Sequence, residues 1–417
     1  MISRLIYALL LALALPYVLL HLLLRGWRQP GYWQHIGERF GHYAQTGDKP
    51  LIWLHAVSVG ETRAAVPLIQ ALQAHYPDYQ ILLTHTTPTG RASSEQLFAD
   101  TVWRVYLPYD YDFAVKRFVR QFRPALGMLM ETEIWPNLIA ACHREHVPVM
   151  LVNARLSVRS ARRYRWLSGM VRQSLANLSG IAAQTSADAE RLRELGGQRI
   201  SIMGNLKFDS TPPAAQLQLG LAWRIQIGEQ RLAWLAASTR EGEEALILDA
   251  WEQMPANNAL LIIVPRHPQR FDQVAELLEK RAIRYQRRSS GVALSSDTQV
   301  WLGDSMGELF AYYQAADLAL IGGSLLPLGG QNLIEAAAVG CPVIIGRHLW
   351  NFAEVSRAAL ASGAAVQVQT ADELAHVVTD LLNDASRRAA MSAAALAFSR
   401  SHQGATARLL DLIAAYL

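Results

Sequence analysis

The sequence predicts an α/β protein of two domains, each built on a parallel sheet that helices cover on both faces. The chain has 417 residues, and a domain usually takes ~100–200 residues. Hydrophobic residues make up 51% and charged residues 18%, so the chain can bury a large core and wholesale disorder is excluded. Short continuous apolar runs alternate with amphipathic stretches, which is the pattern of parallel strands buried between helices.

Two series of apolar runs are predicted to form the strands. The segment 209–215 (DSTPPAA) separates them and has the proline, serine and threonine content of a linker. Amphipathic stretches between the runs, such as 61–75 and 110–122, are predicted helices. The first series is 51–56, 80–84, 125–130, 147–152, 180–184 and 200–203, and the second is 232–237, 259–264, 299–302, 317–322, 342–345 and 364–368.

The domain boundaries follow from this pattern. We predict Rossmann-like domains over 29–210 and 211–417, with a last helix at 403–416 that can pack back toward the first domain. Ligands of such folds bind beyond the carboxyl ends of the strands. We therefore expect the binding site in a cleft where the two domains face each other.

The two halves of the chain differ in charge. Residues 1–210 carry 23 Lys and Arg against 15 Asp and Glu, whereas the remainder carries 16 against 20. An anionic partner is therefore expected to meet the first half. The two cysteines, Cys142 and Cys341, cannot build a disulfide framework or a thiolate metal cluster, and a reducing compartment suits them.

The amino-terminal segment is predicted to associate with a membrane. Residues 5–24 are free of formal charge, and a helix of this length spans about 30 Å of hydrocarbon. Arg25 and Arg28 follow it and only Arg4 precedes it, which places the body of the protein in the cytoplasm. We predict a membrane anchor helix over 1–28. A shallow interfacial helix and a buried core helix are the alternatives.

The first predicted strand leads into H-A-V-S-V-G-E at 55–61. Ser58 and Gly60 suit a tight turn, and Glu61 falls in the first turn of the following helix, where the helix dipole favours a carboxylate. Such a carboxylate at the mouth of a cleft is a candidate general base for an alcohol. The alternative is that Glu61 only complements the helix terminus.

A second acidic motif, E-T-E-I-W-P-N, begins at Glu131 directly after a predicted strand. Two acids beside an apolar strand, Glu131 and Glu133, need partners, and Arg155 or Lys207 can supply them. The alternative is a set of charges at a helix start. A basic cluster that suits phosphates, or else a solvated helix face, follows at Arg159, Arg162, Arg163 and Arg165.

The second domain carries groups suited to a nucleotide phosphate. Ser238 and Thr239 follow its first strand, and their hydroxyls can face a phosphate at a helix start. Arg266 stands between Pro265 and Pro268 at the next strand end. The glycine-rich segment 322–335 lets the backbone approach a ligand closely and is expected to free its amides for that ligand. A plain glycine-rich loop without function is the alternative.

Within this segment, Asn332 opens a predicted helix whose dipole can face a phosphate, and Glu335 can accept hydrogen bonds from ribose hydroxyls. The segment 303–309 lies at another strand end and can offer backbone groups to a base.

Several common fingerprints are absent from the sequence. It has no G-x-G-x-x-G after the first strand, no P-loop and no H-E-x-x-H, which argues against dinucleotide oxidoreduction, P-loop hydrolysis and zinc proteolysis. His267 has no second ligand at metal spacing, and the second domain, which carries the groups suited to a nucleotide phosphate, has no D-x-D pattern. We predict no metal and no cofactor.

Seven segments together resemble the 3-deoxy-D-manno-octulosonic acid (Kdo) transferase family of GT-B glycosyltransferases. The segments are HAVSVGE (55–61), ETEIWPN (131–137), NARLS (153–157), GNLKFD (204–209), VPRHP (264–268), GDSMGEL (303–309) and GGSLLPLGGQNLIE (322–335). The resemblance covers nearly the whole chain. It implies a GT-B fold and transfer of Kdo from CMP-Kdo to lipid A precursor in lipopolysaccharide biosynthesis.

The resemblance also implies roles for individual residues. Glu61 matches the family's proton acceptor. The positions that hold CMP match Pro265, Arg266, Met306, Gly307, Glu308, Asn332, Leu333, Ile334 and Glu335. Positions near the donor sugar or the acceptor match Ser58, Gly60, Glu131, Arg155, Lys207, Ser238 and Thr239. Gln331 departs from the histidine expected in some relatives.

These implications predict an inverting, metal-independent displacement at the anomeric carbon. Glu61 deprotonates an acceptor hydroxyl while Arg266 and the helix at Asn332 stabilise the departing phosphate. The expected partners are CMP-Kdo, lipid A precursor and the lipids of the inner membrane, with the catalytic domains on the cytoplasmic side and no nucleic acid. The alternatives are a nucleotide-sugar epimerase of the same form and a non-catalytic, membrane-tethered nucleotide-sugar binder.

Overall fold

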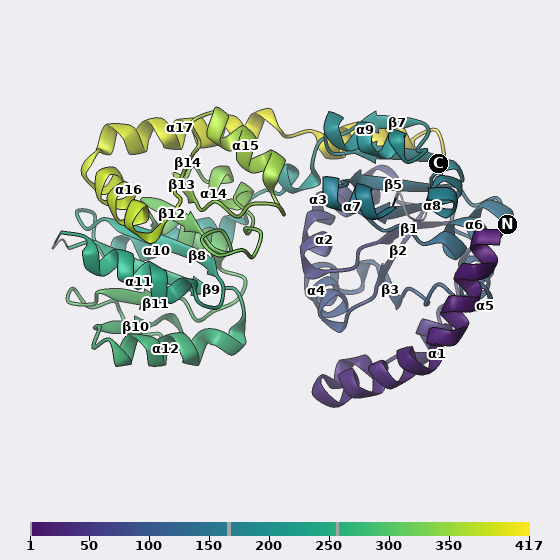
Figure 1. Cartoon of the computed structure of the whole chain (residues 1–417), viewed down its shortest axis with the longest axis horizontal. Coiled ribbons are helices and arrows are strands. Elements are labelled where there is room, and N and C mark those ends of the chain that lie inside the picture. Colours follow the sequence, from purple (N-terminus) through teal and green to yellow (C-terminus); the bar gives the residue numbers. More distant parts are fainter. Residues whose placement is uncertain (1, 165–167, 256–257) are drawn as a thin grey trace. The chain divides into compact units, whose positions relative to one another are not determined.

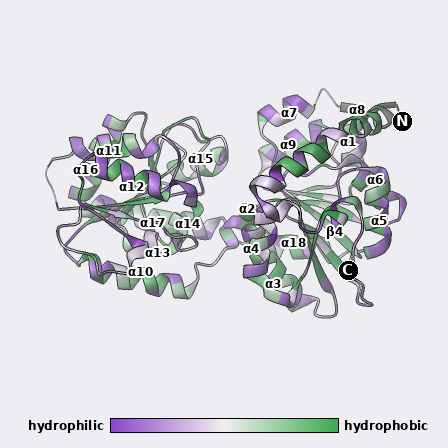
Figure 2. Ribbon diagram, turned by 90° about the horizontal axis from the view of Figure 1, so that it is seen from below, coloured by the Kyte–Doolittle hydropathy of each residue, from purple (hydrophilic) through white to green (hydrophobic). Residues whose placement is uncertain are grey.

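A computed structural model describes residues 2–164, 168–255 and 258–417. The chain forms two compact units: the first runs to Ser210 and also includes Gln403–Leu417, and the second is Thr211–His402. Each unit holds a seven-stranded parallel sheet with helices on both faces (Figure 1). The strands of each unit are hydrophobic, whereas the outward surfaces of the surrounding helices are largely hydrophilic (Figure 2).

The sheet of the first unit has the strand order β3-β2-β1-β4-β5-β6-β7. The register of the central pairs aligns Leu51 with Gln80 and Ile52 with Leu126. The strands are β1 (Leu51–His55), β2 (Gln80–His85), β3 (Trp103–Tyr106), β4 (Leu126–Met130), β5 (Val149–Ala154), β6 (Gly180–Ala183) and β7 (Ile200–Ile202).

Helices cover both faces of this sheet because its strands alternate apolar side chains between two cores. Leu129 of β4 packs among residues of α5, α6, α8 and α9, whereas Met128 packs with residues of α3 and α18 on the other face. The helices of this unit are α1 (Ile2–Arg28), α2 (Val59–Ala64), α3 (Val66–His75), α4 (Pro88–Phe98), α5 (Asp112–Phe122), α6 (Pro136–Arg144), α7 (Val158–Tyr164), α8 (Ser168–Ala176), α9 (Ser186–Glu194) and α18 (Ala405–Ile413).

The sheet of the second unit has the order β10-β11-β9-β8-β12-β13-β14. Its strands are β8 (Ala233–Thr239), β9 (Leu260–Pro265), β10 (Tyr285–Arg287), β11 (Val300–Leu302), β12 (Leu318–Ile321), β13 (Val343–Ile345) and β14 (Ala365–Gln367). Its helices are α10 (Ala214–Ile227), α11 (Glu243–Gln253), α12 (Phe271–Lys280), α13 (Leu309–Ala315), α14 (Ile334–Ala338), α15 (Ala353–Ala361), α16 (Ala371–Asn383) and α17 (Ala385–Ser401).

The predicted fold class is confirmed, and every predicted strand is found within a few residues of its expected bounds. Sequence reasoning missed β3 and β10, which lie at sheet edges and lack a continuous apolar run. The single helix predicted over 61–75 is wrong, because the structure divides it at Ala65 into α2 and α3. Pro67, which has no N–H to donate, stands in the first turn of α3.

The carboxy-terminal helix α18 belongs to the first unit. Its Leu409 and Ile413 are fully buried in the core that also contains residues of α3. Asp209 holds the start of α18, since its carboxylate accepts the backbone N–H of Gly404 at 2.7 Å and that of Thr406 at 2.5 Å.

Helix α1 is apolar and mostly exposed. Its segment Ile6–Trp27 has a mean hydropathy of 2.3 and is long enough to cross a membrane. Two hydrogen bonds tie its amino-terminal half to the rest of the first unit. The Tyr7 hydroxyl donates to Asp110 at 3.0 Å, and the Tyr111 hydroxyl donates to the carbonyl of Leu11 at 3.0 Å.

Candidate active site

In each sheet, later strands are added on both sides of the first strand, so the strand order reverses there. Such a reversal is a preferred position for a ligand. In the first unit β1 lies between β2 and β4, and in the second unit β8 lies between β9 and β12. Open parallel sheets bind ligands outside the carboxyl ends of the strands at such a switch point. The predicted site residues lie at these edges: Glu61 follows β1, Glu131 follows β4, and Thr239 ends β8.

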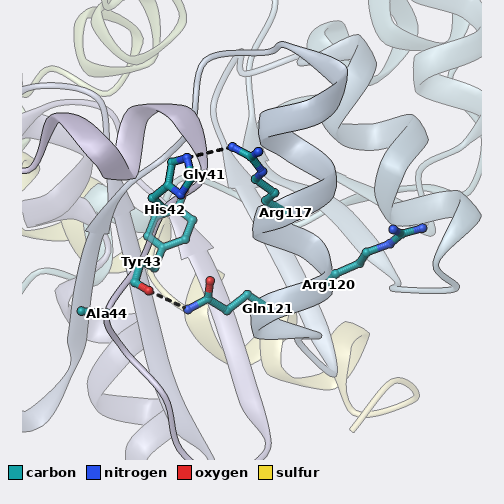
Figure 3. Close-up of a pocket in the computed structure, with 7 residues that line it drawn as sticks. All are labelled: Gly41, His42, Tyr43, Ala44, Arg117, Arg120 and Gln121. Atoms are coloured by element: carbon teal, nitrogen blue, oxygen red, sulfur yellow. Dashed lines mark hydrogen bonds between the residues drawn. The ribbon is translucent and has the colours of Figure 1, made fainter.

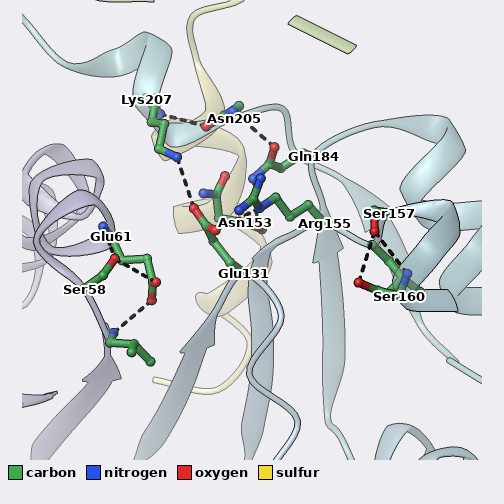
Figure 4. Close-up of polar contacts among 12 residues, drawn as sticks. Ser58, Glu61, Glu131, Asn153, Arg155, Ser157, Ser160, Gln184, Asn205 and Lys207 are labelled. Atoms are coloured by element: carbon green, nitrogen blue, oxygen red, sulfur yellow. Dashed lines mark hydrogen bonds and ion pairs between the residues drawn. The ribbon is translucent and has the colours of Figure 1, made fainter. Parts of the chain in front are cut away.

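Glu61 is held in a capping box at the start of α2 (Figure 4). Ser58 is the N-cap residue; its hydroxyl accepts the backbone N–H of Glu61 at 3.3 Å and donates to Oε1 at 3.0 Å. The backbone N–H of Val57 donates to Oε2 at 2.9 Å. Gly60 is exposed and has an ordinary φ, and a Cβ there would meet only the Ser58 hydroxyl, at 3.8 Å. The face beside Glu61 is therefore open.

The environment of Glu61 suits proton transfer near neutral pH. Burial raises the pKa of Glu61 to about 7; the negative charges of Glu131 and Glu133 act in the same direction, and the hydrogen bonds from Val57 and Ser58 act against it. A general base is most effective when its pKa lies near the working pH.

Glu131 is the anion of a charged cluster beside Glu61 (Figure 4). Its side chain is almost fully buried, and its two oxygens face different cations, the Nε of Arg155 at 2.9 Å and the Nζ of Lys207 at 3.2 Å. Burial alone would raise the pKa of Glu131, but Lys207 and Arg155 outweigh it and lower the pKa. The predicted partners of Glu131 are thus the observed ones.

The backbone around this cluster is strained and tied by hydrogen bonds. Glu131 and Asn153 have φ values of +58° and +50°, in the left-handed region that residues other than glycine seldom adopt. The Asn153 carbonyl accepts from Gln184 at 3.0 Å, the Gln184 side chain accepts from Asn205 at 3.1 Å, and Asn205 accepts the backbone N–H of Lys207 at 3.0 Å (Figure 4). This chain of bonds fixes the position of Lys207.

Glu133 and His55 form a second polar group that sequence reasoning did not assign. Glu133 accepts from the Trp135 indole at 2.7 Å, and burial raises its pKa. His55 is fully buried and contacts Thr84, and burial lowers its pKa to about 3, so it is neutral. The histidine opening the motif at 55–61 is therefore a packed core residue.

The basic cluster after β5 lies partly on α7. The side chains of Arg159, Arg162 and Arg163 are exposed there, whereas Arg165 falls outside the described residues. These exposed cations form a basic surface on the first unit.

Cations gather at the carboxyl edge of the second sheet. The backbone N–H of Arg266 donates to the carbonyl of Thr239 at 3.0 Å, which fixes Arg266 beside the end of β8. The pKa of the neighbouring His267 is lowered, first by burial and then by the positive charges of Arg240, Arg266 and Arg270. All three arginines contribute positive potential at this edge, although the charge of Arg270 is compensated by its ion pair with Glu244 at 2.8 Å.

The glycine-rich loop after β12 is held by Glu243, a fully buried residue at the start of α11. The Glu243 carboxylate accepts the backbone N–H groups of Gly323 at 2.5 Å, Leu325 at 3.0 Å and Arg240 at 2.9 Å. We expected the loop to free its amides for a ligand, and this expectation is wrong for Gly323 and Leu325. A Cβ on Gly322 would lie 2.4 Å from the carbonyl oxygen of Ser238, so only glycine fits there.

Ser238 and Thr239 end β8 at a bulge, and Ser238 has a φ of +56°. The Thr239 hydroxyl is buried and donates to Glu244 at 2.8 Å, and Arg270 binds the other oxygen of Glu244 at 2.8 Å. Thr239 therefore positions the strand end through Glu244, which sequence reasoning did not assign.

The expected helix start at Asn332 is two residues late in the structure, since α14 begins at Ile334 and has only five residues. The Asn332 side chain accepts the backbone N–H of Ile334 at 3.2 Å and donates to Glu335 at 3.0 Å. Leu333 and Ile334 are buried, so only their backbone groups can meet a ligand.

The loop after β11 presents Met306, Gly307 and Glu308. Met306 is exposed, and Gly307 has a φ of +83°. One carboxylate oxygen of Glu308 binds Arg288 at 3.0 Å, and the other is buried without a hydrogen-bond partner among the described residues. Glu308 thus retains an acceptor for a ligand N–H or O–H. Within residues 2–164, 168–255 and 258–417, no group of three or more His, Cys, Asp or Glu is arranged to hold a metal ion.

Comparisons with protein families match both units. Residues 34–210 match the family described as "3-Deoxy-D-manno-octulosonic-acid transferase (kdotransferase)". Residues 245–397 match "Glycosyl transferases group 1".

Full-length relatives agree with these matches. The chain is 43% identical to the 3-deoxy-D-manno-octulosonic acid transferase of Bordetella pertussis over the whole of both chains. It is 39% identical to that of Haemophilus influenzae over 99% of both chains. A probable mitochondrial transferase of this name from Arabidopsis thaliana is 33% identical over 88% of this chain and 86% of its own.

Solved structures share the fold at low identity. A glycosyltransferase of Rickettsia africae has a TM-score of 0.61 at 11% identity, covering 89% of this chain and 98% of its own. The UDP-GlcNAc 2-epimerase of Neisseria meningitidis has a TM-score of 0.61 at 15% identity, covering 88% of this chain and all of its own. These likenesses extend to the GT-B-like fold alone.

Proposed function

The chain belongs to the 3-deoxy-D-manno-octulosonic acid (Kdo) transferase family, and from this premise we propose that it moves Kdo from CMP-Kdo to a hydroxyl of lipid A precursor. It is a Kdo-transferring glycosyltransferase of lipopolysaccharide biosynthesis. The single observation that carries the proposed chemistry is Glu61, a half-buried carboxylate with a pKa of about 7 at the switch point of the first sheet.

The second unit is proposed to hold the donor. The positive potential of Arg240, Arg266 and Arg270 suits the phosphate of CMP. The unpartnered oxygen of Glu308 suits the exocyclic amine of cytosine, a donor that carboxylates accept well. Backbone groups of Pro265, Gly307, Leu333 and Ile334 and the side chains of Met306, Asn332 and Glu335 complete the proposed nucleotide site.

The first unit is proposed to activate the acceptor. The Glu61 carboxylate takes the proton of an acceptor hydroxyl, the hydroxyl oxygen forms a bond to the anomeric carbon of Kdo, and the bond from that carbon to the phosphate oxygen of CMP breaks. This single displacement inverts the anomeric configuration. The charge of the leaving CMP is stabilised by Arg266, so the step needs no metal ion.

The remaining residues are proposed to position these groups. Ser58 and Gly60 orient Glu61 and leave its face open. The ion pairs of Glu131 leave Arg155 and Lys207 held at the same sheet edge, where they suit the carboxylate of Kdo. Ser238 and Thr239 hold the end of β8 beside Arg266.

We propose that α1 anchors the protein to the cytoplasmic face of the inner membrane. Its exposed side chains are large and apolar, and they include Ile6, Leu9, Leu10, Leu13, Tyr17, Leu20, Leu23, Leu24 and Trp27. The hydrogen bonds of Tyr7 and Leu11 with the first unit favour a helix that lies in the membrane interface beside the body over one that leaves the body to span the bilayer.

The purified full-length chain, mixed with CMP-Kdo and lipid A precursor, tests the proposal. We expect release of CMP and a product heavier by Kdo, measured by chromatography and mass spectrometry, with full activity in the presence of EDTA. UDP-N-acetylglucosamine is the control donor, and we expect neither transfer nor epimerisation from it. Absence of Kdo transfer, or loss of transfer with EDTA, would contradict the corresponding part of the proposal.

A further inference from the structure

A pocket of about 310 Å³ lies within the first unit, between α1 and the loops that follow β1 and β2. His21 and Arg25 line it from α1, and Tyr32 and Arg39 line it from the segment after that helix. On the opposite side it is lined by Glu133 and by Val57. The backbone N–H of Val57 donates to Glu61, so this pocket adjoins the turn that carries the proposed base.

Arg39 is the unusual residue of the pocket, because its guanidinium is only 2% exposed and incompletely paired. One nitrogen donates to the carbonyl of Thr86 at 3.0 Å. The other two, Nε and Nη2, have no hydrogen-bond partner among the residues that the structure describes. The guanidinium lies 4.0 Å from the centre of the Tyr106 ring, which offsets only part of the cost of burying a charge.

The nearby acids do not neutralise Arg39. Glu38 precedes it in the chain and is buried, but the Glu38 carboxylate is bound by Arg91 at 2.8 Å and by the backbone N–H of Tyr106 at 2.7 Å. Glu133 lines the same pocket and binds Trp135, and burial raises its pKa. A buried guanidinium with two free donor nitrogens fits an external anion that accepts both, and a phosphate has that geometry.

Another hollow of the first unit also contains arginines, but their surroundings differ from those of Arg39 (Figure 3). It measures about 650 Å³ and is lined by Arg117 and Arg120 of α5. Arg117 contacts the His42 ring at 2.8 Å, and Arg120 pairs with Glu145 at 2.9 Å. These guanidiniums are exposed and engaged, so nothing in this hollow calls for an anion.

We propose that the pocket beside α1 binds a phosphate of the acceptor headgroup, with Arg39 as its bidentate ligand and Arg25 at its entrance. The inference rests on the proposed function. Helix α1 lines this pocket and also carries exposed apolar side chains, so a lipid can keep its acyl chains in the membrane while its phosphorylated sugar reaches toward Val57 and Glu61.

The test compares Arg39→Gln with Arg120→Gln, which removes the same charge from the exposed hollow. Full-length proteins are assayed with bisphosphorylated acceptor and with the two monophosphorylated forms. Hydrogen bonds to charged groups contribute about 1.5–3 kcal/mol, so we expect R39Q to raise the acceptor KM by about 10-fold to 150-fold. We expect R39Q to leave the KM for CMP-Kdo unchanged. We expect R120Q to leave both the KM for the acceptor and the KM for CMP-Kdo unchanged. Removing the phosphate that Arg39 binds raises the wild-type KM similarly and leaves the KM of R39Q unchanged.

Flotation on vesicles tests the pocket without turnover and separates the sources of phosphate. We expect wild type to bind phosphatidylcholine vesicles containing the acceptor more strongly than R39Q does, and both to bind phosphatidylglycerol vesicles equally. An unchanged acceptor KM, or weaker binding of R39Q to phosphatidylglycerol alone, overturns the inference. If wild type transfers no Kdo but the flotation difference holds, the proposed function fails and the phosphate site stands. Should R39Q not fold, Arg39→Lys keeps the charge and is expected to show the same losses in smaller degree.

Discussion

The switch points of the two sheets place a glutamate at the same point of the fold and use it differently. Glu61 and Glu243 both lie in the first turn of the helix that follows the first strand of their sheet. Glu61 is half-buried and accepts one backbone N–H and one hydroxyl at its carboxylate. Glu243 is fully buried and accepts three backbone N–H groups, two of them from a loop about 80 residues away.

This difference shows what separates a structural acid from a reactive one. Glu243 is buried and uses its carboxylate to hold three backbone donors in place. Burial raises the pKa of Glu61, the negative charges of Glu131 and Glu133 raise it further, and its two donors offset only part of this shift. The local motif is a poor guide to the role, because the surroundings decide it.

The largest effect is expected on the stability of the second unit. Glu243→Ala leaves the N–H groups of Gly323, Leu325 and Arg240 without their acceptor, at about 1–3 kcal/mol each. Glu61→Ala removes one hydrogen bond to a backbone N–H and one to a hydroxyl at the start of α2, at about 1 kcal/mol each. Urea unfolding measures the loss in the free energy of unfolding of each variant. Amide hydrogen exchange of residues 322–335 measures the loosening of the loop, and we expect fast exchange there in E243A alone. Equal losses of stability in E243A and E61A would contradict the different roles assigned to Glu243 and Glu61.

The next effect concerns catalysis. Glu61→Gln keeps the size of the side chain but removes the base, so we expect kcat to fall at least about 100-fold, the smaller end of the range for general bases. CMP binding stays unchanged, because the donor is proposed to bind in the second unit. Steady-state kinetics and calorimetry with CMP check both. Full activity in E61Q would remove Glu61 from the mechanism.

The fold could be predicted largely from sequence, because buried parallel strands are continuous apolar runs. The edge strand β3 (WRVY) was missed because an edge strand needs no such run. The division of the helix at Ala65 could have been predicted from the sequence, because Pro67 is favoured in the first turn of a helix and disfavoured in its interior. The ion pairs of Glu131 were predicted correctly because acids next to buried strands require partners.

The roles of Glu243 and Arg39 could not be predicted in this way. Glu243 depends on a loop that reaches it only when β8 and β12 pair. Arg39 has no acidic partner among the residues that the structure describes, because Arg91, which lies 53 positions along the chain from Glu38, binds the Glu38 carboxylate. Such assignments depend on competition between distant residues, and a one-dimensional pattern does not carry that information.

The pH dependence of the wild-type enzyme follows from the raised pKa of Glu61. The base acts in its ionised form, so activity is lost as pH falls through the pKa of about 7. We expect kcat/KM to reach a plateau above that pH and to be about tenfold below the plateau at one unit under it. A buffer series with constant ionic strength measures the profile. A midpoint near 4.5 would show that Glu61 is as exposed as an ordinary surface acid.

Glu131→Gln is expected to move this midpoint to lower pH. The negative charge of Glu131 raises the pKa of Glu61, and its removal also leaves the positive charges of Lys207 and Arg155 uncompensated, which acts in the same direction. The pH profile of kcat/KM gives the midpoint whatever the change in its plateau. A midpoint shifted to higher pH would contradict the assigned electrostatics.

Glu133→Gln is expected to give the smallest effect, an acidic shift of the same midpoint that is smaller than that of E131Q. Glu133 also raises the pKa of Glu61 but contributes less than Glu131, and its carboxylate accepts a hydrogen bond from the neutral indole of Trp135. Measuring both profiles in one buffer series orders the two shifts. If E133Q moved the midpoint further than E131Q, the order assigned to the two contributions to the pKa of Glu61 would be wrong, and the ion pairs of Glu131 would have to shield Glu61 from its charge.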